Sequence, residues 1–170
     1  MRSDDTNVEE LGIPFNTENA LIVGKNEDGK AKLMTELIKL EAENLRVIIT
    51  DRYLFPAKKN NPDYETLIID ILKSLKAKEI LYCSDRLQDP ALFTRVQKTM
   101  KQVGTDLIHY NLADFHDRYW ICLEKRKAIV VGTSVNGIGN SVYHVNALDT
   151  EDVEQLFKEL QSRGVLAKDE

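Results

Sequence analysis

Cysteine is scarce in this chain. Among its 170 residues only Cys83 and Cys122 are cysteines, and both lie in apolar runs, where a thiol serves as a small core side chain. Two such residues do not make the dense framework of a disulfide-stapled fold, and with the histidines they match no metal-binding spacing. The sequence therefore predicts a cytoplasmic protein in a reducing compartment, and we expect no metal site and no cofactor.

Long apolar segments are missing as well. No stretch approaches the roughly 20 residues that a membrane-spanning helix needs. The first residues, MRSDDTNVEELG, are acidic and contain no apolar signal segment. We expect residues 1–15 to form a flexible acidic tail and residues 16–170 to form a single domain, because a chain of this length supports one self-sufficient core.

Positive charge is in short supply. The 23 Lys and Arg residues are outnumbered by 28 Asp and Glu residues, which gives a net charge of −5. Proteins that gather nucleic acid or anionic membranes electrostatically carry the opposite balance. The basic stretches 58–59 and 125–127 are predicted to be solvated turn residues. The composition thus argues against a general DNA-degrading enzyme. It does not exclude a local basic patch on the surface.

What the sequence does contain is an alternation of short apolar runs and amphipathic segments. Asp89 followed by Pro90 is typical of a helix start. The alternation of strands and helices indicates a largely parallel sheet. The predicted strands lie at 21–23, 45–51, 79–85 and 106–111, and the predicted helices lie at 30–43, 63–77 and 90–103.

The pattern changes after His116. The apolar runs 119–124 and 128–132 are separated by three basic residues, which predicts a hairpin. A further strand is expected at 141–148. A closing helix is expected at 150–164, with Thr150 as its cap and Gly164 at its end.

Polar residues follow three of the predicted strands. Asp51 and Asp85 each stand where a buried strand stops, and His116 comes shortly after the next strand. In open α/β sheets ligands collect beyond such carboxyl ends. Arg118 lies two residues after His116 and so shares its face in an extended segment, where a guanidinium matches a pair of phosphate oxygens. Asp117 alternates to the other face and is expected to anchor the loop.

The glycine-rich stretch from Gly132 to Gly139 completes the pattern. Ser134 and Asn136 share one face if this stretch is extended, and both carry neutral hydrogen-bond donors. Glycine lets the backbone approach a ligand closely. Spacing alone leaves two interpretations equally open, a phosphate site or a glycine-rich hairpin beside a structurally satisfied histidine.

The residues His116-x-Arg118 and Gly132-Thr133-Ser134-Val135-Asn136 resemble the second half of the phospholipase D (PLD) motif. In that family the pattern is His-x-Lys-x-x-x-x-Asp, followed by Gly-Ser-x-Asn on the next strand. Asp51 and Tyr53 resemble an Asp-x-Tyr element of PLD-like domains. The resemblance covers roughly residues 20–162. It is strongest to a degenerate branch with a single His-Asp-Arg motif, which includes small prokaryotic proteins and the C-terminal domain of some MIT-domain proteins.

The resemblance implies a PLD-like α/β fold for residues 16–170, a mixed sheet flanked by helices on both faces. It also implies His116 and Arg118 as catalytic residues and Asp51, Tyr53, Asp117, Ser134 and Asn136 as ligand-binding residues. Three departures are visible: Arg118 replaces the family lysine, Leu123 stands where the family has aspartate, and Thr133 interrupts the Gly-Ser pair. The neighbouring Glu124 would point the other way on a strand.

Two hypotheses follow, and they leave open whether the protein is an enzyme. In the first, the domain has lost its chemistry and binds a phosphate-bearing ligand or a partner, as one subunit of a larger assembly of the prokaryotic defence type. In the second, it is a metal-independent phosphodiesterase or nuclease in which His116 acts as nucleophile or general acid. The family uses two such histidines, so a chain with one motif would have to form a homodimer. Nucleic acid is thus one candidate partner.

Overall fold

The computed structural model describes residues 19–22, 27–57, 61–135, 138 and 142–167. The predicted tail at 1–15, the basic pair at 58–59 and Asn136 lie outside the described residues. The elements in chain order are β1 (Asn19–Ile22), α1 (Glu27–Ile38), β2 (Arg46–Thr50), α2 (Pro62–Ser74), β3 (Glu79–Ser84), α3 (Pro90–Gln102), β4 (Asp106–Asn111), β5 (Arg118–Cys122), β6 (Lys127–Val131), β7 (Tyr143–Ala147) and α4 (Thr150–Ser162).

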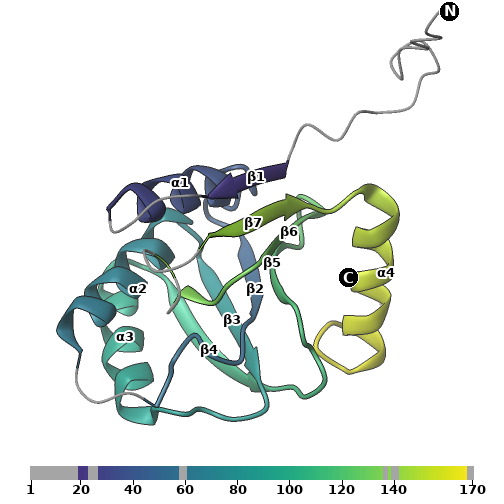
Figure 1. Cartoon of the computed structure of the whole chain (residues 1–170). Helices are drawn as coiled ribbons and strands as arrows, with labels where there is room; N and C mark the ends of the chain where they lie inside the picture. The colour runs from purple at the N-terminus through teal and green to yellow at the C-terminus, as the bar shows by residue number, and fades with distance from the viewer. Residues whose placement is uncertain (1–18, 23–26, 58–60, 136–137, 139–141, 168–170) are drawn as a thin grey trace, which may run out of the picture.

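The strands form one mixed sheet, seven-stranded in the described part of the chain, in the order β1-β7-β6-β5-β2-β3-β4. β2, β3 and β4 are parallel, whereas β5 runs antiparallel to β2 and leads into the antiparallel β6, β7 and β1. Helices cover both faces (Figure 1), with α1, α2 and α3 on one and α4 on the other. The predicted α/β mixed sheet flanked by helices is therefore confirmed.

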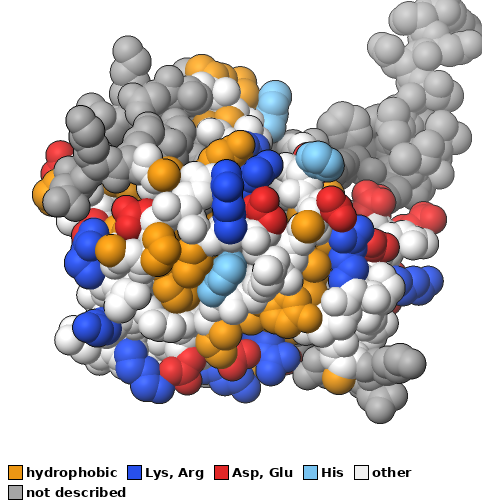
Figure 2. Space-filling view, turned by 90° about the horizontal axis from the view of Figure 1, so that it is seen from below, with side chains coloured by type: hydrophobic (Ala, Val, Ile, Leu, Met, Phe, Trp, Pro, Cys, Tyr) orange, Lys and Arg blue, Asp and Glu red, His pale blue; other side chains and the backbone are white. Residues whose placement is uncertain are grey.

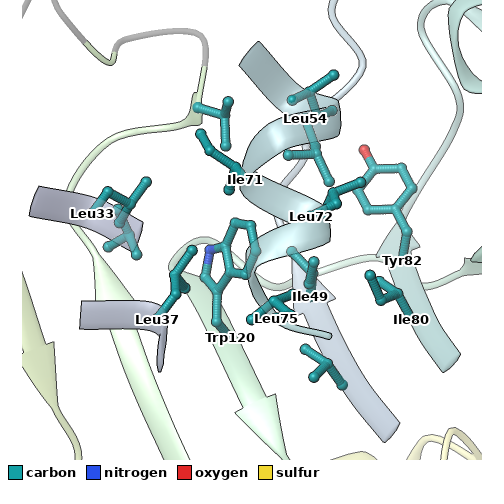
Figure 3. Close-up of a cluster of buried hydrophobic side chains, with 14 of the residues drawn as sticks. Leu33, Leu37, Ile49, Leu54, Ile71, Leu72, Leu75, Ile80, Tyr82 and Trp120 are labelled. Atoms are coloured by element: carbon teal, nitrogen blue, oxygen red, sulfur yellow. The ribbon is translucent and has the colours of Figure 1, made fainter. Parts of the chain in front are cut away.

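The larger core lies between the sheet and α1–α3. Trp120 on β5 is fully buried there, and its indole lies among Leu37, Ile71 and Leu75 (Figure 3). The opposite face packs on the apolar side of α4, which buries Val153, Leu156, Phe157 and Leu160. Because both faces are covered, the central strands are near-continuous apolar runs, and this is why they could be recognised in the sequence.

The helix termini show both agreement and correction. Asp89 is the N-cap of α3, because its carboxylate accepts from the Leu92 amide, and Pro90 is the first residue of this helix, as predicted. The N-cap of α4 is Asp149 rather than the expected Thr150, because its carboxylate accepts from the Asp152 amide. The α4 helix then has acidic residues in its first turn, which suits the helix dipole.

The first helix is shifted from its predicted range. It was expected at 30–43 but spans Glu27–Ile38. After Ile38 the chain tightens into bonds between residues three apart, and Glu41 and Asn44 adopt positive φ angles of 53° and 59°. A residue in the left-handed region cannot continue a right-handed helix, so the helix ends before Glu41. The apolar spacing in the sequence continues beyond this point, and this is why the predicted range ran too far.

None of the helices in the described part of the chain has the length and apolar character that crossing a bilayer requires. The feature that concerns function is the edge of the sheet where the parallel strands end. β2, β3 and β4 all finish at the lower edge in Figure 1, and the segments that follow them meet there.

Candidate functional site

A cavity of about 240 Å³ lies at this edge of the sheet. It is formed by the ends of β2 and β3, the segment after β4 and the first residue of β5. Its lining consists of Thr50, Asp51, Arg52, Tyr53, Cys83, Ser84, Asp85, Leu112, Ala113, Asp114, Phe115, His116 and Arg118. Asp51, Asp85 and His116, which follow the three parallel strands, all line this cavity as expected, and Arg118 lines it with them.

A hydrogen-bonded tie between β2 and β5 places two of these residues side by side. The Thr50 hydroxyl donates to the Asp117 carbonyl at 3.1 Å and accepts from the Tyr119 amide at 3.0 Å. Thr50 is buried, so this pairing is shielded from competing water. It fixes the start of β5 against the end of β2, and so it sets Arg118 beside Asp51.

Asp51 forms part of the cavity wall and is almost completely enclosed, with 2% of its surface exposed. Its Oδ1 accepts from the Tyr53 amide at 2.9 Å, but its Oδ2 has no hydrogen-bond partner among the described residues. Burial raises the pKa of Asp51, and the Tyr53 amide, the Ser134 hydroxyl and the Arg118 charge oppose that rise only in part. The carboxyl group is thus biased toward its neutral form.

Arg118 extends along the cavity wall with 29% of its side chain exposed. Its Nε lies 3.8 Å from Oδ1 of Asp51, which is an ion-pair distance but too long for a hydrogen bond. Within the described ranges its Nε has no hydrogen-bond partner. The guanidinium is therefore oriented by Asp51 without being saturated by it.

Ser134 lies near Asp51 but does not line the cavity. Its side chain is enclosed, and its hydroxyl favours the ionised Asp51 carboxylate without completing a well-formed hydrogen bond in the described structure. The sequence pattern suggested direct contact with a ligand, whereas this placement gives Ser134 a supporting position. Asn136, its predicted companion, lies outside the described residues, so their shared face stays a prediction.

Of the remaining predicted site residues, Tyr53 and His116 line the cavity and Asp117 does not. Tyr53 lines the cavity and is 43% exposed. The Asp117 carboxylate is exposed and accepts from the Tyr119 hydroxyl at 3.2 Å, and Asp117 is not among the lining residues. Its backbone carbonyl forms part of the Thr50 tie, so Asp117 helps to anchor the loop, as predicted. His116 is exposed and lines the cavity next to Arg118.

Neither His109 nor Glu124 lines the cavity, although His109 bonds to Ser84, which does. Ser84 Oγ donates its single proton to the Arg86 carbonyl, so it accepts from His109 Nε2 at 2.9 Å. Burial lowers the pKa of His109, which packs against Tyr82. The Glu124 carboxylate accepts from the Arg46 amide at the opposite end of β2. Glu124 therefore does not replace the aspartate of the PLD motif.

The cavity also contains charged residues that the sequence pattern did not single out as site residues. Arg52 pairs with Asp85 across 3.3 Å, which joins the ends of β2 and β3. Asp114 adds a third carboxylate. The position of Asp85 at a strand end was visible in the sequence, but nothing marked Arg52 as its partner.

The face around the site has mixed charge. Viewed from below, Lys and Arg side chains alternate with acidic and hydrophobic ones over the described surface (Figure 2). No cluster of three or more His, Cys, Asp or Glu residues in the described ranges could hold a metal ion. The basic residues at 125–127 lie elsewhere and are paired, with Lys125 and Lys127 facing Glu41 and Arg126 facing Glu154.

Neither a protein-family model nor a curated protein matches this chain. Similar solved structures include the archaeal chromatin protein TrmBL2, at 13% identity and a TM-score of 0.41 over 85% of this chain and 51% of that one. The phospholipase D family member Nuc from Salmonella typhimurium has 12% identity and a TM-score of 0.48 over 85% of this chain and 93% of that one. Polyphosphate kinase from Porphyromonas gingivalis has 11% identity and a TM-score of 0.48 over 84% of this chain and 25% of that one.

Proposed function

We propose that this chain binds a phosphate-bearing ligand in the cavity at the carboxyl edge of its sheet and cleaves it little or not at all. Arg118 is the main anchor. His116 adds a second donor on the same wall, because a histidine ring nitrogen can donate to a phosphate oxygen. The observation that carries this proposal is a partly exposed guanidinium on a cavity wall whose nearest carboxylate does not saturate it.

The electrostatics of the Asp51–Arg118 pair support anion binding. A fully ionised aspartate in hydrogen-bonding contact would neutralise the arginine. Here the separation is 3.8 Å, too long for a hydrogen bond, and burial raises the pKa of Asp51. Arg118 remains charged at any working pH, so much of its charge is available to a ligand. Its planar fork can hold two phosphate oxygens at once.

The surroundings favour a discrete phosphate group over a long polyanion. The carboxylates of Asp85 and Asp114 offset the positive charge of the two arginines in the cavity, and the chain as a whole carries a net charge of −5. A surface of that kind does not collect nucleic acid through its general field. Inorganic phosphate is therefore a suitable probe, because it tests the chemistry shared by a small molecule, a nucleic-acid end or a phosphorylated partner.

Arg118→Ala is expected to raise the Kd for inorganic phosphate by at least about tenfold, because a charge-assisted pair of hydrogen bonds is lost. Isothermal titration calorimetry at constant ionic strength measures this change. Arg95→Ala is the matched control, since Arg95 pairs with Glu65 between α3 and α2 and does not line the cavity. Equal affinities for Arg118→Ala and Arg95→Ala would contradict the proposal.

A second candidate function is metal-independent phosphodiester cleavage by a homodimer. It is favoured by the position of His116 on the same cavity wall as Arg118. Neither His109 nor His144 lines this cavity in the described structure, so a second histidine would have to come from another copy of the chain.

We expect little or no cleavage of single- or double-stranded nucleic acid by the purified protein in the presence of a chelator. Turnover is measured by release of labelled product, with His116→Ala as the control. Robust turnover that disappears in His116→Ala would favour the dimeric phosphodiesterase over the binding protein.

A further inference from the structure

Arg163, at the C-cap of α4, joins that helix to the segment that carries His116. Its Nη1 donates to the Ala113 carbonyl at 3.0 Å and lies 3.7 Å from the Asp114 carboxylate. Its guanidinium also stacks over the Phe115 ring, 5.3 Å from the centroid. Its Nε donates to Glu159 at 2.7 Å, one turn back on α4, and this bond holds the guanidinium in place.

The segment that Arg163 contacts is a wall of the cavity. Residues 112–117, here called the His116 segment, connect β4 to β5 without regular secondary structure, and residues 112–116 all line the cavity. The segment is tied to the sheet at its two ends, by the Leu112 amide to the Ser84 carbonyl and by the Asp117 carbonyl to Thr50. Between those two ties, Arg163 contacts three successive residues.

The backbone of the segment needs such support. Asp114 has a φ angle of 71°, in the left-handed region that costs free energy for a residue with a side chain. Its carboxylate is mostly exposed and so is not fixed by packing. An irregular segment with a strained residue keeps one conformation only when its neighbours determine it. Phe115 packs edge-to-face on Tyr119, and the guanidinium of Arg163 supplies the polar contacts to Ala113 and Asp114.

We propose that Arg163 is a positioning residue for the phosphate site, and that the C-terminal end of α4 sets the affinity of the cavity by fixing the His116 segment. This inference rests on the proposed function of the cavity as a phosphate site. Without Arg163, the segment samples several conformations, and a ligand must then order it on binding. That ordering lowers the affinity although no atom of Arg163 touches the ligand.

Arg163→Ala tests this inference, with Arg126→Ala as a closely matched control. Like Arg163, Arg126 pairs with a carboxylate of α4, Glu154 at 2.7 Å, and lies over an aromatic ring, in this case Phe157 of α4 at 5.0 Å. Its contacts lie toward the other end of the helix, away from the cavity. The two substitutions therefore remove similar interactions with α4, but only one of them releases the His116 segment.

The first measurement needs no ligand. Amide hydrogen exchange and backbone NMR of the intact chain should show faster exchange and shifted signals at residues 113–116 in Arg163→Ala, and no change at these positions in Arg126→Ala. Arg163→Lys keeps the charge but not the planar fork, and it should give an intermediate result. Unchanged signals at 113–116 in Arg163→Ala would overturn the inference whatever the cavity binds.

The second measurement is the Kd for inorganic phosphate. Arg163→Ala is expected to raise this Kd by about two- to tenfold, which is the range for ordering one side chain, while Arg126→Ala leaves it within about twofold. If wild type binds phosphate and Arg163→Ala binds it equally well, the positioning role is wrong and the proposed function stands. If wild type shows no binding, the proposed function fails first, and the inference fails with it.

Discussion

Trp120→Ala is expected to lower the free energy of unfolding by about 3–5 kcal/mol, the range for replacing a buried large aromatic with alanine. Trp120 is 1% exposed and lies in the middle of the core between the sheet and the helices. Its indole contacts side chains from α1 and α2 and is carried by β5, the strand that also begins with Arg118 (Figure 3). The cavity left by alanine would lie where these three elements meet, so it cannot collapse without moving one of them.

Urea denaturation followed by circular dichroism measures this effect, because Trp120 is the chain's one tryptophan and its fluorescence is lost on substitution. Trp120→Phe keeps an aromatic ring in the same space and should lose clearly less stability than the alanine variant. If Trp120→Ala is too unstable to purify, Trp120→Phe still gives a denaturation midpoint, and we expect this midpoint to lie below that of wild type. A midpoint for Trp120→Ala equal to that of wild type would show that the core does not depend on this side chain.

The alternation of strands and helices could be predicted because the physics behind it is local. β3 was expected at 79–85 and spans Glu79–Ser84, and β4 was expected at 106–111 and spans Asp106–Asn111. Each is short and bounded by polar residues, and β3 is a run of apolar residues, as a strand buried on both faces must be. Helix ends were harder to place. Asp149 and Thr150 are both good N-caps, and sequence alone does not choose between two adjacent candidates.

The candidate site was predictable in part because it depends on the order of the strands. Asp51 and His116 follow parallel strands, and such strands end at one edge of a sheet, so their proximity follows from topology. Arg163 was not predictable, since its bond to Ala113 joins residues 50 positions apart through the packing of α4. The enclosed position of Ser134 also depends on tertiary packing, which a pattern of alternating faces does not contain.

Asp51→Asn is expected to stabilise the folded protein by about 1–3 kcal/mol at neutral pH, the range for relieving an unsatisfied buried polar group. The Oδ2 of Asp51 and the hydroxyl of Ser134 are both enclosed without a hydrogen-bond partner in the described part of the chain. An asparagine keeps an acceptor for the Tyr53 amide, and its N–H group can donate to the nearby Ser134 hydroxyl. It also removes the charge that burial penalises.

The pH dependence of that gain identifies its cause. In the unfolded chain Asp51 has its ordinary pKa of 3.8, and in the folded protein burial raises this pKa. Below the unfolded value both states are protonated, so the charge contributes nothing to the difference between the two proteins. As the pH rises, the unfolded chain ionises first, and wild type loses stability until the pH has passed the raised folded pKa. The advantage of Asp51→Asn should therefore grow with pH across that window and then level off.

Asp106→Asn is the control for this prediction, because Asp106 keeps 52% of its side chain exposed at the start of β4. Its partner is Lys101 at 2.5 Å, and an exposed pair of this kind contributes about 0–1 kcal/mol, so its loss should change stability little. Denaturation midpoints of the three proteins between pH 4 and 8 are the measurement. A stability difference between wild type and Asp51→Asn that stays constant over this range would contradict the buried-charge explanation. A gain that grows with pH would show that Asp51, the carboxylate 3.8 Å from Arg118, destabilises the fold through its buried charge.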